Sequence, residues 1–144
     1  MICINGDDNL TYRYSGIKKL ASGWTKALLE LKGKVEEFCG EKFNFALCNL
    51  YRNGEDYIGP HSDDTRDLAS GSSIVSISLG AERDFLLKSK KDKSSHTVSL
   101  PHGSMIVMRT GAQELYKHSV PKRKKIVNKR INITFRNIDN NKNK

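Results

Sequence analysis

Apolar side chains recur at helical spacing in one segment of the chain, between residues 22 and 39. They follow one another at intervals of four, three, four and three residues, which places them on one face of an α-helix. The residues on this face are Trp24, Leu28, Leu31, Val35 and Phe38. Ser22 suits the N-cap position and Gly40 the C-cap. The pattern predicts one amphipathic helix from about Ser22 to Cys39.

The rest of the chain has the pattern of short strands separated by turns. The expected strands cover 10–16, 43–51, 73–80, 83–88, 96–100, 104–109 and 130–138. Short turns favour a hairpin between 73–80 and 83–88, and a second pair between 96–100 and 104–109. One helix before many strands predicts a mainly β (α+β) fold, a double-layered jelly roll with the helix packed on it. We expect a single domain over 1–144, with a core at about 10–138 and a disordered tail at 139–144.

Length and composition narrow the class of protein. A chain of 144 residues with a mean hydropathy of -0.58 fits one soluble domain. No apolar run approaches the roughly 20 residues of a membrane span, and the first residues do not resemble a secretory signal. The three cysteines are scattered and lack a CxxC pair, which argues against a disulfide framework and against a zinc knuckle. An intracellular protein without membrane contact is expected.

Positive charge is concentrated late in the chain. The net charge is +9, and no acid interrupts the basic residues Lys117, Lys122, Arg123, Lys124, Lys125, Lys129 and Arg130. A second basic run contains Arg83, Lys88, Lys90, Lys91 and Lys93. Clustered cations suit a polyanion, because each phosphate contact releases counterions. The charge favours a nucleic-acid partner, and the alternative is a solvated surface that keeps the protein soluble.

The tripeptide His61-Ser62-Asp63 is the first candidate for metal chemistry. Residues i and i+2 of a strand project to the same side, so this imidazole and carboxylate can converge on one ion. A third ligand would complete the two-histidine, one-carboxylate arrangement of non-haem iron. His118 is the best third ligand, because His96 begins a strand in a polar, Ser-rich hairpin region and His102 lies between Pro101 and Gly103, so that both are expected at turns. The tripeptide alone is weak support, since a surface turn explains it equally well.

The last expected strand carries the strongest local signal. Alternate positions are polar, at Arg130, Asn132, Thr134 and Arg136, with apolar residues between them. The simple alternative is a strand whose polar face meets water. Two arginines around an asparagine are better explained by an anionic ligand inside a barrel, because the planar guanidinium binds carboxylates through paired hydrogen bonds. Asn49 and Tyr51 are again two residues apart and can add donors to the same ligand.

Five ordered motifs together resemble one known family. They are NLYRNGEDYIGPHSDD, SISLGAERDFLLK, LPHGSMIVM, HSVP and RINITFR. In this order and spacing they are similar to the AlkB family of Fe(II)/2-oxoglutarate dioxygenases, and most similar to its eukaryotic nucleic-acid-repair branch. The similarity runs from about Leu10 to Ile138. The fold that the resemblance implies is a double-stranded β-helix, in agreement with the strand pattern.

The resemblance also implies a role for individual residues. His61, Asp63 and His118 would bind Fe(II), and Asn49, Tyr51 and Arg130 would hold the distal carboxylate of 2-oxoglutarate. Asn132 and Arg136 would support the carboxylate beside the keto group, and Thr134 would line the same face. Asp64 would contact the exocyclic amine of a damaged base. The basic stretches 117–130 and 83–93, with Lys88, Lys122, Arg123 and Lys124 among them, would contact phosphates.

The implied activity is oxidative removal of N-methyl groups from DNA bases, with 2-oxoglutarate and O2 as co-substrates. Formaldehyde, succinate and CO2 would be released, and 1-methyladenine and 3-methylcytosine would be substrates after base extrusion. We expect a monomer in the nucleus or cytoplasm. The alternatives are an RNA or protein demethylase on the same core, a nucleic-acid-binding remnant without catalysis, and a small-molecule hydroxylase.

Two departures from the branch affect the expected substrate. Its members carry a longer N-terminal part with a lid and an apolar wedge that fills the gap left by a flipped base, whereas this sequence begins about ten residues before the segment LTYRYSG. Thr65 also stands where an acidic base-contacting residue is common. We therefore expect single strands to be preferred over duplex DNA.

Overall fold

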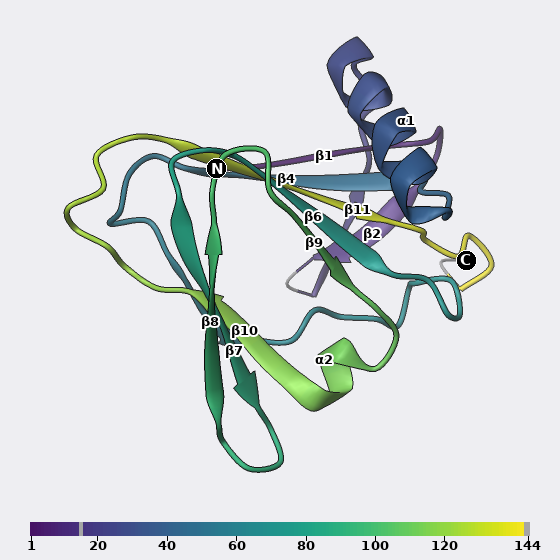
Figure 1. The fold of residues 1–144 in the computed structure, drawn as a ribbon. Helices are drawn as coiled ribbons and strands as arrows, with labels where there is room; N and C mark the ends of the chain where they lie inside the picture. The colour runs from purple at the N-terminus through teal and green to yellow at the C-terminus, as the bar shows by residue number, and fades with distance from the viewer. Residues whose placement is uncertain (15, 143–144) are drawn as a thin grey trace.

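The computed structural model describes residues 1–14 and 16–142 (Figure 1). The strands are β1 (Ile2–Gly6), β2 (Thr11–Tyr14), β3 (Ile17–Leu20), β4 (Phe45–Tyr51), β5 (Ile58–His61), β6 (Ile74–Gly80), β7 (Arg83–Ser89), β8 (Ser95–Leu100), β9 (Met105–Met108), β10 (Tyr116–Val120) and β11 (Arg130–Arg136). The helices are α1 (Lys26–Cys39) and the single turn α2 (Ala112–Leu115). The predicted mainly β fold is confirmed. Neither helix is long and apolar enough to cross a membrane.

Two antiparallel sheets form the body of the molecule. The larger sheet has the order β1-β4-β11-β6-β9 and the smaller one β5-β10-β7-β8, with β2 and β3 as a separate hairpin. One apolar cluster joins Phe45 and Leu47 of the larger sheet to Phe85 and Val120 of the smaller sheet. A second cluster joins Val35 of α1 to the opposite face of the larger sheet. The inner face of the larger sheet therefore packs against the smaller sheet, and α1 lies on its outer face (Figure 1).

Both predicted hairpins are wrong, because the chain changes sheets at the turns in question. β6 pairs with β11 and β9, whereas β7 pairs with β10 and β8. The corner at Gly80 has a φ of 92°, and a Cβ there would overlap the carbonyl of Lys129. At the second corner the Gly103 N–H donates to Ser78 O at 2.7 Å. Backbone contacts to the larger sheet thus hold both corners and prevent a simple hairpin.

The helix is shorter at its beginning than predicted. Ser22 is not the N-cap, because its backbone pairs with β1 through hydrogen bonds to Ile4 and Gly6. Thr25 takes this role and accepts the Leu28 N–H at 3.2 Å. Gly40 is the C-cap, as predicted, with a φ of 70°. Phe38 was placed on the buried face but is 77% exposed.

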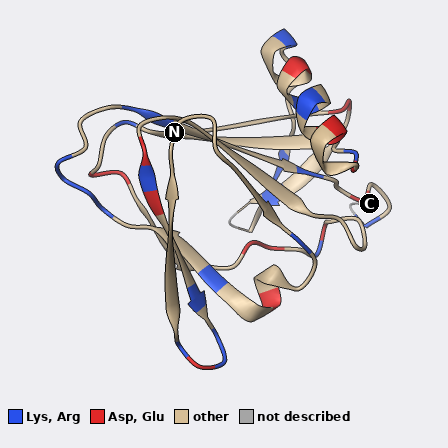
Figure 2. Cartoon of the chain, in the orientation of Figure 1, with Lys and Arg blue, Asp and Glu red and all other residues tan. Residues whose placement is uncertain are grey.

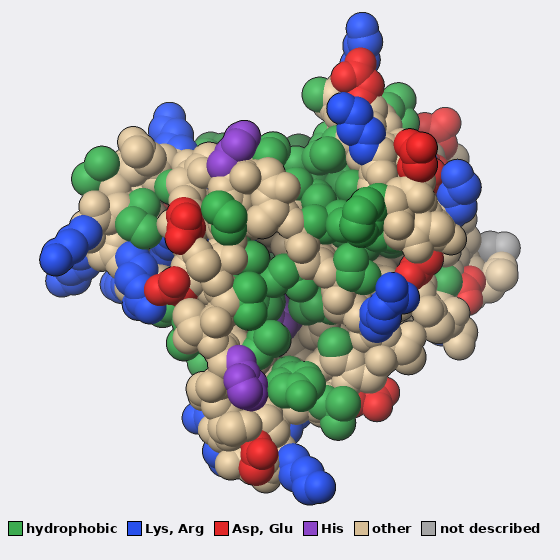
Figure 3. All heavy atoms as spheres, in the orientation of Figure 1, with side chains coloured by type: hydrophobic (Ala, Val, Ile, Leu, Met, Phe, Trp, Pro, Cys, Tyr) green, Lys and Arg blue, Asp and Glu red, His purple; other side chains and the backbone are tan. Residues whose placement is uncertain are grey.

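Apolar side chains remain partly open where α1 meets the sheet. Leu28 and Leu31 of the helix and Leu79, Met105 and Val107 of the strands pack against the outer cluster without being fully buried. Figure 3 shows hydrophobic side chains gathered beside α1, over this part of the larger sheet. The helix therefore covers the outer face of the sheet only in part.

The alternation predicted for the last strand is confirmed by burial. β11 lies between β4 and β6, and all four of its alternating polar residues are buried. On the other side Ile133 and Phe135 belong to the outer cluster below α1, while Ile131 is 42% exposed. The polar side chains thus face the interior between the sheets, where each needs a partner.

The segment after β11 was expected to be a disordered tail from residue 139. Residues 139–142 form a turn, in which the Asp139 N–H donates to Asp67 O (2.9 Å) and Lys142 Nζ to Leu68 O (3.0 Å). Residues 143 and 144, like Ser15 in the expected strand 10–16, lie outside the described residues. Disorder at the very end stays a prediction.

Glu36 connects the end of α1 to the start of β4. Its carboxylate accepts the Phe43 N–H (2.9 Å) and lies 2.9 Å from Lys32 Nζ and 3.1 Å from Lys42 Nζ. Burial would raise its pKa, but these three donors outweigh burial and lower the pKa below its usual 4.5. The charged carboxylate is therefore the form that stabilises the fold.

We expect Glu36→Gln to lower the free energy of unfolding by about 1–2 kcal/mol at neutral pH, because charge-assisted hydrogen bonds are lost. The folded pKa lies below the unfolded one, so this contribution is complete above pH 4.5 and is lost as the pH falls through the folded pKa. Urea unfolding at several pH values should show the gap to the wild type closing in acid. The exposed Glu37→Gln is the control, and a gap independent of pH would contradict the prediction.

Candidate metal and co-substrate site

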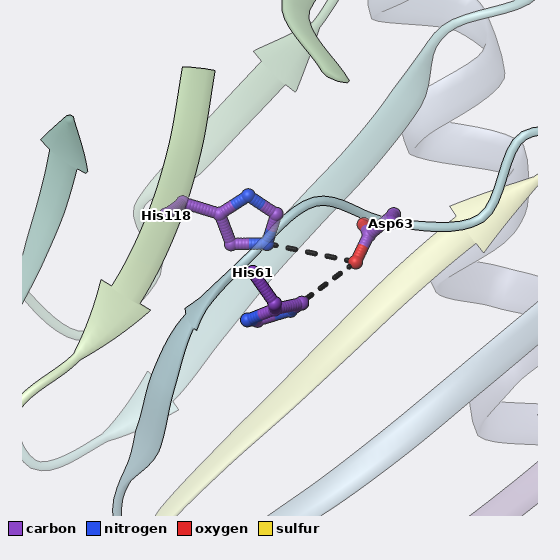
Figure 4. A group of neighbouring side chains, drawn as sticks. All are labelled: His61, Asp63 and His118. Carbon is purple, nitrogen blue, oxygen red and sulfur yellow. Dashed lines mark ion pairs between the residues drawn. The ribbon is translucent and has the colours of Figure 1, made fainter. Parts of the chain in front are cut away.

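Two histidines and one aspartate converge between the smaller sheet and the loop after β5. His61 is the last residue of β5, and His118 is its direct partner on β10. Their Nε2 atoms lie 3.4 Å and 3.5 Å from Asp63 Oδ1 (Figure 4). One ligand atom from each residue falls within 4.8 Å of the others. Three donors of the types that bind non-haem iron thus point to one place.

The reason for this convergence differs from the predicted one. Asp63 follows β5 and lies in a loop, so strand alternation does not align it with His61. The loop instead returns the carboxylate towards both imidazoles. His96 was expected in a turn but lies exposed in β8. His102 does lie in a turn, where its Nδ1 accepts the Gly80 N–H at 2.9 Å. Neither belongs to the cluster.

The environment prepares the three side chains for a cation. His61 Nδ1 lies 2.8 Å from the Gly59 carbonyl, which can accept a hydrogen bond from a protonated Nδ1. In that tautomer the lone pair of Nε2 is available to a metal ion. Burial would raise the pKa of Asp63, but the charge of Arg136 and hydrogen bonds from the two histidines outweigh it and hold the pKa well below its usual range. The hydrogen bond to Asp63 is the main cause that raises the pKa of His61. The carboxylate is therefore charged at neutral pH.

Arg136 connects this cluster to the larger sheet. Its Nη2 lies 3.2 Å from Asp63 Oδ2, and its Nη1 donates to the Tyr12 hydroxyl. Both Arg136 and Tyr12 are at most 3% exposed. Burial is the main cause that raises the pKa of Tyr12, so the phenol stays neutral. The sequence pattern did not point to Tyr12, because nothing local shows that it meets a residue 124 positions away.

All the predicted co-substrate residues line one cavity together with His61, Asp63 and His118, which are called the metal cluster below. The cavity has a volume of about 560 Å³. Its walls include Asn49, Tyr51, Arg130, Asn132, Thr134 and Arg136, together with His61, Asp63 and His118. Two strands of the larger sheet supply the six co-substrate residues, and the smaller sheet and its loop supply the metal cluster. The interior between the sheets is therefore a ligand-sized chamber.

Arg130 is the arginine of this chamber with two buried nitrogens that have no hydrogen-bond partner among the described residues. Its Nη2 donates to Ser78 Oγ at 2.8 Å, whereas Nε and Nη1 have none. The guanidinium carbon lies 5.1 Å from the centre of the Tyr51 ring. Unpaired donors on a buried guanidinium fit a ligand carboxylate, which would accept them in pairs. The residues present therefore suit a dicarboxylate that also reaches the metal cluster.

Asn132 and Thr134 are already engaged in the sheet. The Asn132 amide donates to Ser76 Oγ (2.6 Å) and Ile77 O (3.2 Å). The Thr134 hydroxyl donates to Leu47 O at 3.2 Å. Both side chains hold neighbouring strands together while lining the chamber. Their direct contact with a co-substrate stays a prediction.

The predicted substrate residues are spread over the surface. Asp64 lines the chamber, and its carboxylate is bound by Arg66 at 2.5 Å. Lys88, Lys122 and Lys124 are exposed and do not line the chamber. Arg123 Nε donates to Asp84 at 2.7 Å, so part of its charge is neutralised. In Figure 2 the basic positions of the loop between β10 and β11 are coloured blue and lie at one end of the molecule.

Two arginines of the basic runs are not on the surface. Arg130 is 2% exposed and Arg83 only 1%. Arg83 donates to the carbonyls of Asn53, Asp56 and Pro121 at 2.8–3.2 Å. The prediction that the whole run at 83–93 grips phosphates is therefore wrong for Arg83, whose donors join three chain segments inside the protein.

Comparison with known proteins places the chain in a family. A family model described as the 2OG-Fe(II) oxygenase superfamily matches residues 2–136. Proteins named DNA oxidative demethylase ALKBH2 are 40% identical in Bos taurus and in Homo sapiens, and each match covers 92% of this chain. The alpha-ketoglutarate-dependent dioxygenase alkB homolog 3 of Bos taurus is 38% identical over 90% of this chain.

These matches cover 51%, 54% and 49% of the relatives, so the chain spans about half the length of the curated proteins that it resembles. A solved structure, described as the structure of OsALKBH1, matches with a TM-score of 0.71 over 94% of this chain and 77% of that one. At 16% identity it supports the fold alone. The fold, the family model and the sequence relatives agree: this chain belongs to the 2OG-Fe(II) oxygenase superfamily, in its AlkB family.

Proposed function

We propose that this protein is an Fe(II)- and 2-oxoglutarate-dependent demethylase that removes N-methyl groups from alkylated bases of DNA. The observation that carries the proposal is one chamber containing both the His61, Asp63 and His118 cluster and the unpaired guanidinium donors of Arg130. Fe(II) held by the cluster, together with 2-oxoglutarate and O2, would supply the oxidising chemistry. The products would be formaldehyde, succinate, CO2 and the unmodified base.

Different side chains of the chamber would bind the two carboxylates of 2-oxoglutarate. Arg130 would receive the distal carboxylate of 2-oxoglutarate, with Tyr51 and Asn49 beside it. Little water competes for a buried guanidinium, so this contact is stronger than it would be on the surface. Arg136 holds Asp63 in its charged form and faces the place for the second carboxylate, with Asn132 and Thr134 supporting it. These contacts would orient the keto group towards the metal.

A methylated base fits the remaining features of the site. Two of the relatives named above are DNA oxidative demethylases by name, and the net charge of +9 favours a polyanion. The target base would leave the stack to reach the chamber, and 1-methyladenine and 3-methylcytosine suit this because their positive charge and weakened pairing ease extrusion. Asp64, at the chamber wall, would contact the exocyclic amine. Lys88, Lys122, Arg123 and Lys124 would contact phosphates, with the protein acting as a monomer in the nucleus or cytoplasm.

The activity itself is the first test. Protein, Fe(II), ascorbate and 2-oxoglutarate should remove the methyl group from an oligonucleotide with a single 1-methyladenine, followed by mass spectrometry with succinate measured in parallel. Single-stranded DNA, duplex DNA and RNA are compared, and methyl loss from RNA alone would replace the DNA assignment. Methyl loss from none of them, without succinate, would refute the demethylase proposal. Asp63→Ala should be inactive, and equal activity in this variant would refute the metal assignment.

The role of Arg130 makes a separate prediction. Arg130→Met should raise the KM for 2-oxoglutarate by at least about 30-fold, because truncating one side of a buried charge pair costs ~2 kcal/mol or more. The KM for the oligonucleotide should stay unchanged. The exposed Arg52→Met is the matched control. A folded Arg130→Met protein with the KM of the wild type would contradict the placement of the distal carboxylate.

The surface lysines are tested by the salt dependence of binding. In the double variant Lys122→Gln and Lys124→Gln, affinity for an unmodified oligonucleotide should fall, and the slope of log affinity against log salt should decrease by about 0.7–0.9 per lost phosphate contact. Fluorescence anisotropy at several salt concentrations measures both. Lys34→Gln on α1 is the control for charge alone. Equal slopes in all three proteins would place the phosphates elsewhere.

A further inference from the structure

We propose that Gln113 is a positioning residue of the metal centre, which holds the loop that carries Asp63 at its working distance from His118. The proposal rests on the metal site assigned above. It assigns a role to a residue that touches neither the metal cluster's donor atoms nor the proposed co-substrate. The inference comes from one side chain that connects the two chain segments supplying the ligands.

The backbone of Asp63 depends on this side chain. Residues 62–65 lie outside the strands and have no ladder hydrogen bonds. The Asp63 N–H donates to Gln113 Oε1 at 2.7 Å, across a separation of 50 residues. The neighbouring Ser62 hydroxyl donates to Tyr116 O at 2.8 Å. Both bonds attach the loop to the same short segment, 113–116, which leads directly into β10.

Gln113 is itself held from two sides. Its Nε2 donates to Met108 Sδ (3.4 Å) at the end of β9. The backbone carbonyl of Gln113 accepts a hydrogen bond from Lys90 Nζ at 2.6 Å, and the backbone N–H of Lys90 donates to Leu115 O at 2.9 Å. The turn between β7 and β8 thus holds α2 in place through hydrogen bonds from Lys90. A side chain fixed in this way can impose a position on the loop rather than follow it.

The arrangement sets the spacing of the metal ligands. His61 and His118 are already in register, because β5 pairs with β10. Asp63 has no such constraint on its backbone, and the ion pair with Arg136 acts only on its carboxylate. Gln113 supplies the missing backbone constraint from the segment that also carries His118. Outer groups that orient ligands in this way contribute about 10- to 100-fold to metal affinity in other metalloproteins.

A matched pair of variants isolates the hydrogen bond. Gln113→Met is close in size but has no oxygen to accept the Asp63 N–H, whereas Gln113→Glu keeps a carboxylate oxygen. Both variants lose the amide N–H that donates to Met108 Sδ. They differ in whether residue 113 has an oxygen that can accept the Asp63 N–H. Co(II), whose visible absorption reports its coordination, serves as the metal probe in the full chain without nucleic acid or 2-oxoglutarate.

We expect Gln113→Met to bind Co(II) about 10- to 100-fold more weakly than the wild type, and Gln113→Glu to recover most of the loss. Thermal unfolding without metal should be similar for the two variants. A difference in their Co(II) affinity then reports the metal site and not the stability of the fold. Equal Co(II) affinity of a folded Gln113→Met protein and the wild type would overturn the proposal. Equal weakening in both variants would overturn it as well.

A second variant covers the case in which Gln113→Met does not fold. Lys90→Met removes the support behind the Gln113 carbonyl and should weaken Co(II) binding, whereas Lys91→Met in the exposed turn should not. Equal affinities in these two proteins would refute the proposal. The demethylase assay fails independently: intact Co(II) binding with no methyl loss counts against the proposed function and leaves the role of Gln113 standing.

Discussion

The ion pair between Arg136 and Asp63 joins the co-substrate side of the chamber to the metal-binding side. Arg136 belongs to the central strand of the larger sheet, and Asp63 to the loop after β5 of the smaller sheet. Both charges are largely withdrawn from water, so loss of either partner would leave the other uncompensated, at a cost of about 3–5 kcal/mol. Because Arg136 also contacts the Tyr12 hydroxyl, the β2–β3 hairpin is tied to the same point. The geometry of the chamber follows from this pair.

The buried arginines show how similar residues serve different purposes. Arg83 and Arg130 lie near the same Tyr51 ring, with guanidinium carbons 5.6 Å and 5.1 Å from its centre. Arg83 donates to three backbone carbonyls and so closes the structure around the loop after β4. Arg130 donates to Ser78, and two of its buried nitrogens have no partner among the described residues. A buried cation with open donors is costly in a folded chain unless a ligand completes it.

The metal ligands are positioned by three different kinds of contact. His61 and His118 face each other through strand pairing, and the Asp63 carboxylate is directed by Arg136. The Asp63 backbone is held by Gln113, from the segment that precedes His118. Each contact joins segments far apart in sequence, so the donors are arranged before a metal arrives. Such arrangement reduces what the ion must organise when it binds.

The sequence by itself determined the elements and the chemical character of the site. Period-two alternation on the last strand identified its buried polar face, because in a strand the side chain alternates whatever the neighbours are. The motifs were specific enough to name the family. They also sufficed to single out His118 and Arg130, although the tripeptide His61-Ser62-Asp63 alone did not.

Only the tertiary structure decided which strands pair and which charges are buried. The turns at Gly80 and Gly103 read as hairpins, yet contacts with Lys129 and Ser78 turn the chain into the other sheet. Arg83 and Lys88 look alike in a basic run, but one is enclosed and the other exposed. Gln113 and Tyr12 carry no local signal at all. Local patterns report the conformation of a segment, whereas burial and partners depend on residues distant in the sequence, 50 positions away for Gln113 and 124 for Tyr12. These residues come together only in the folded chain.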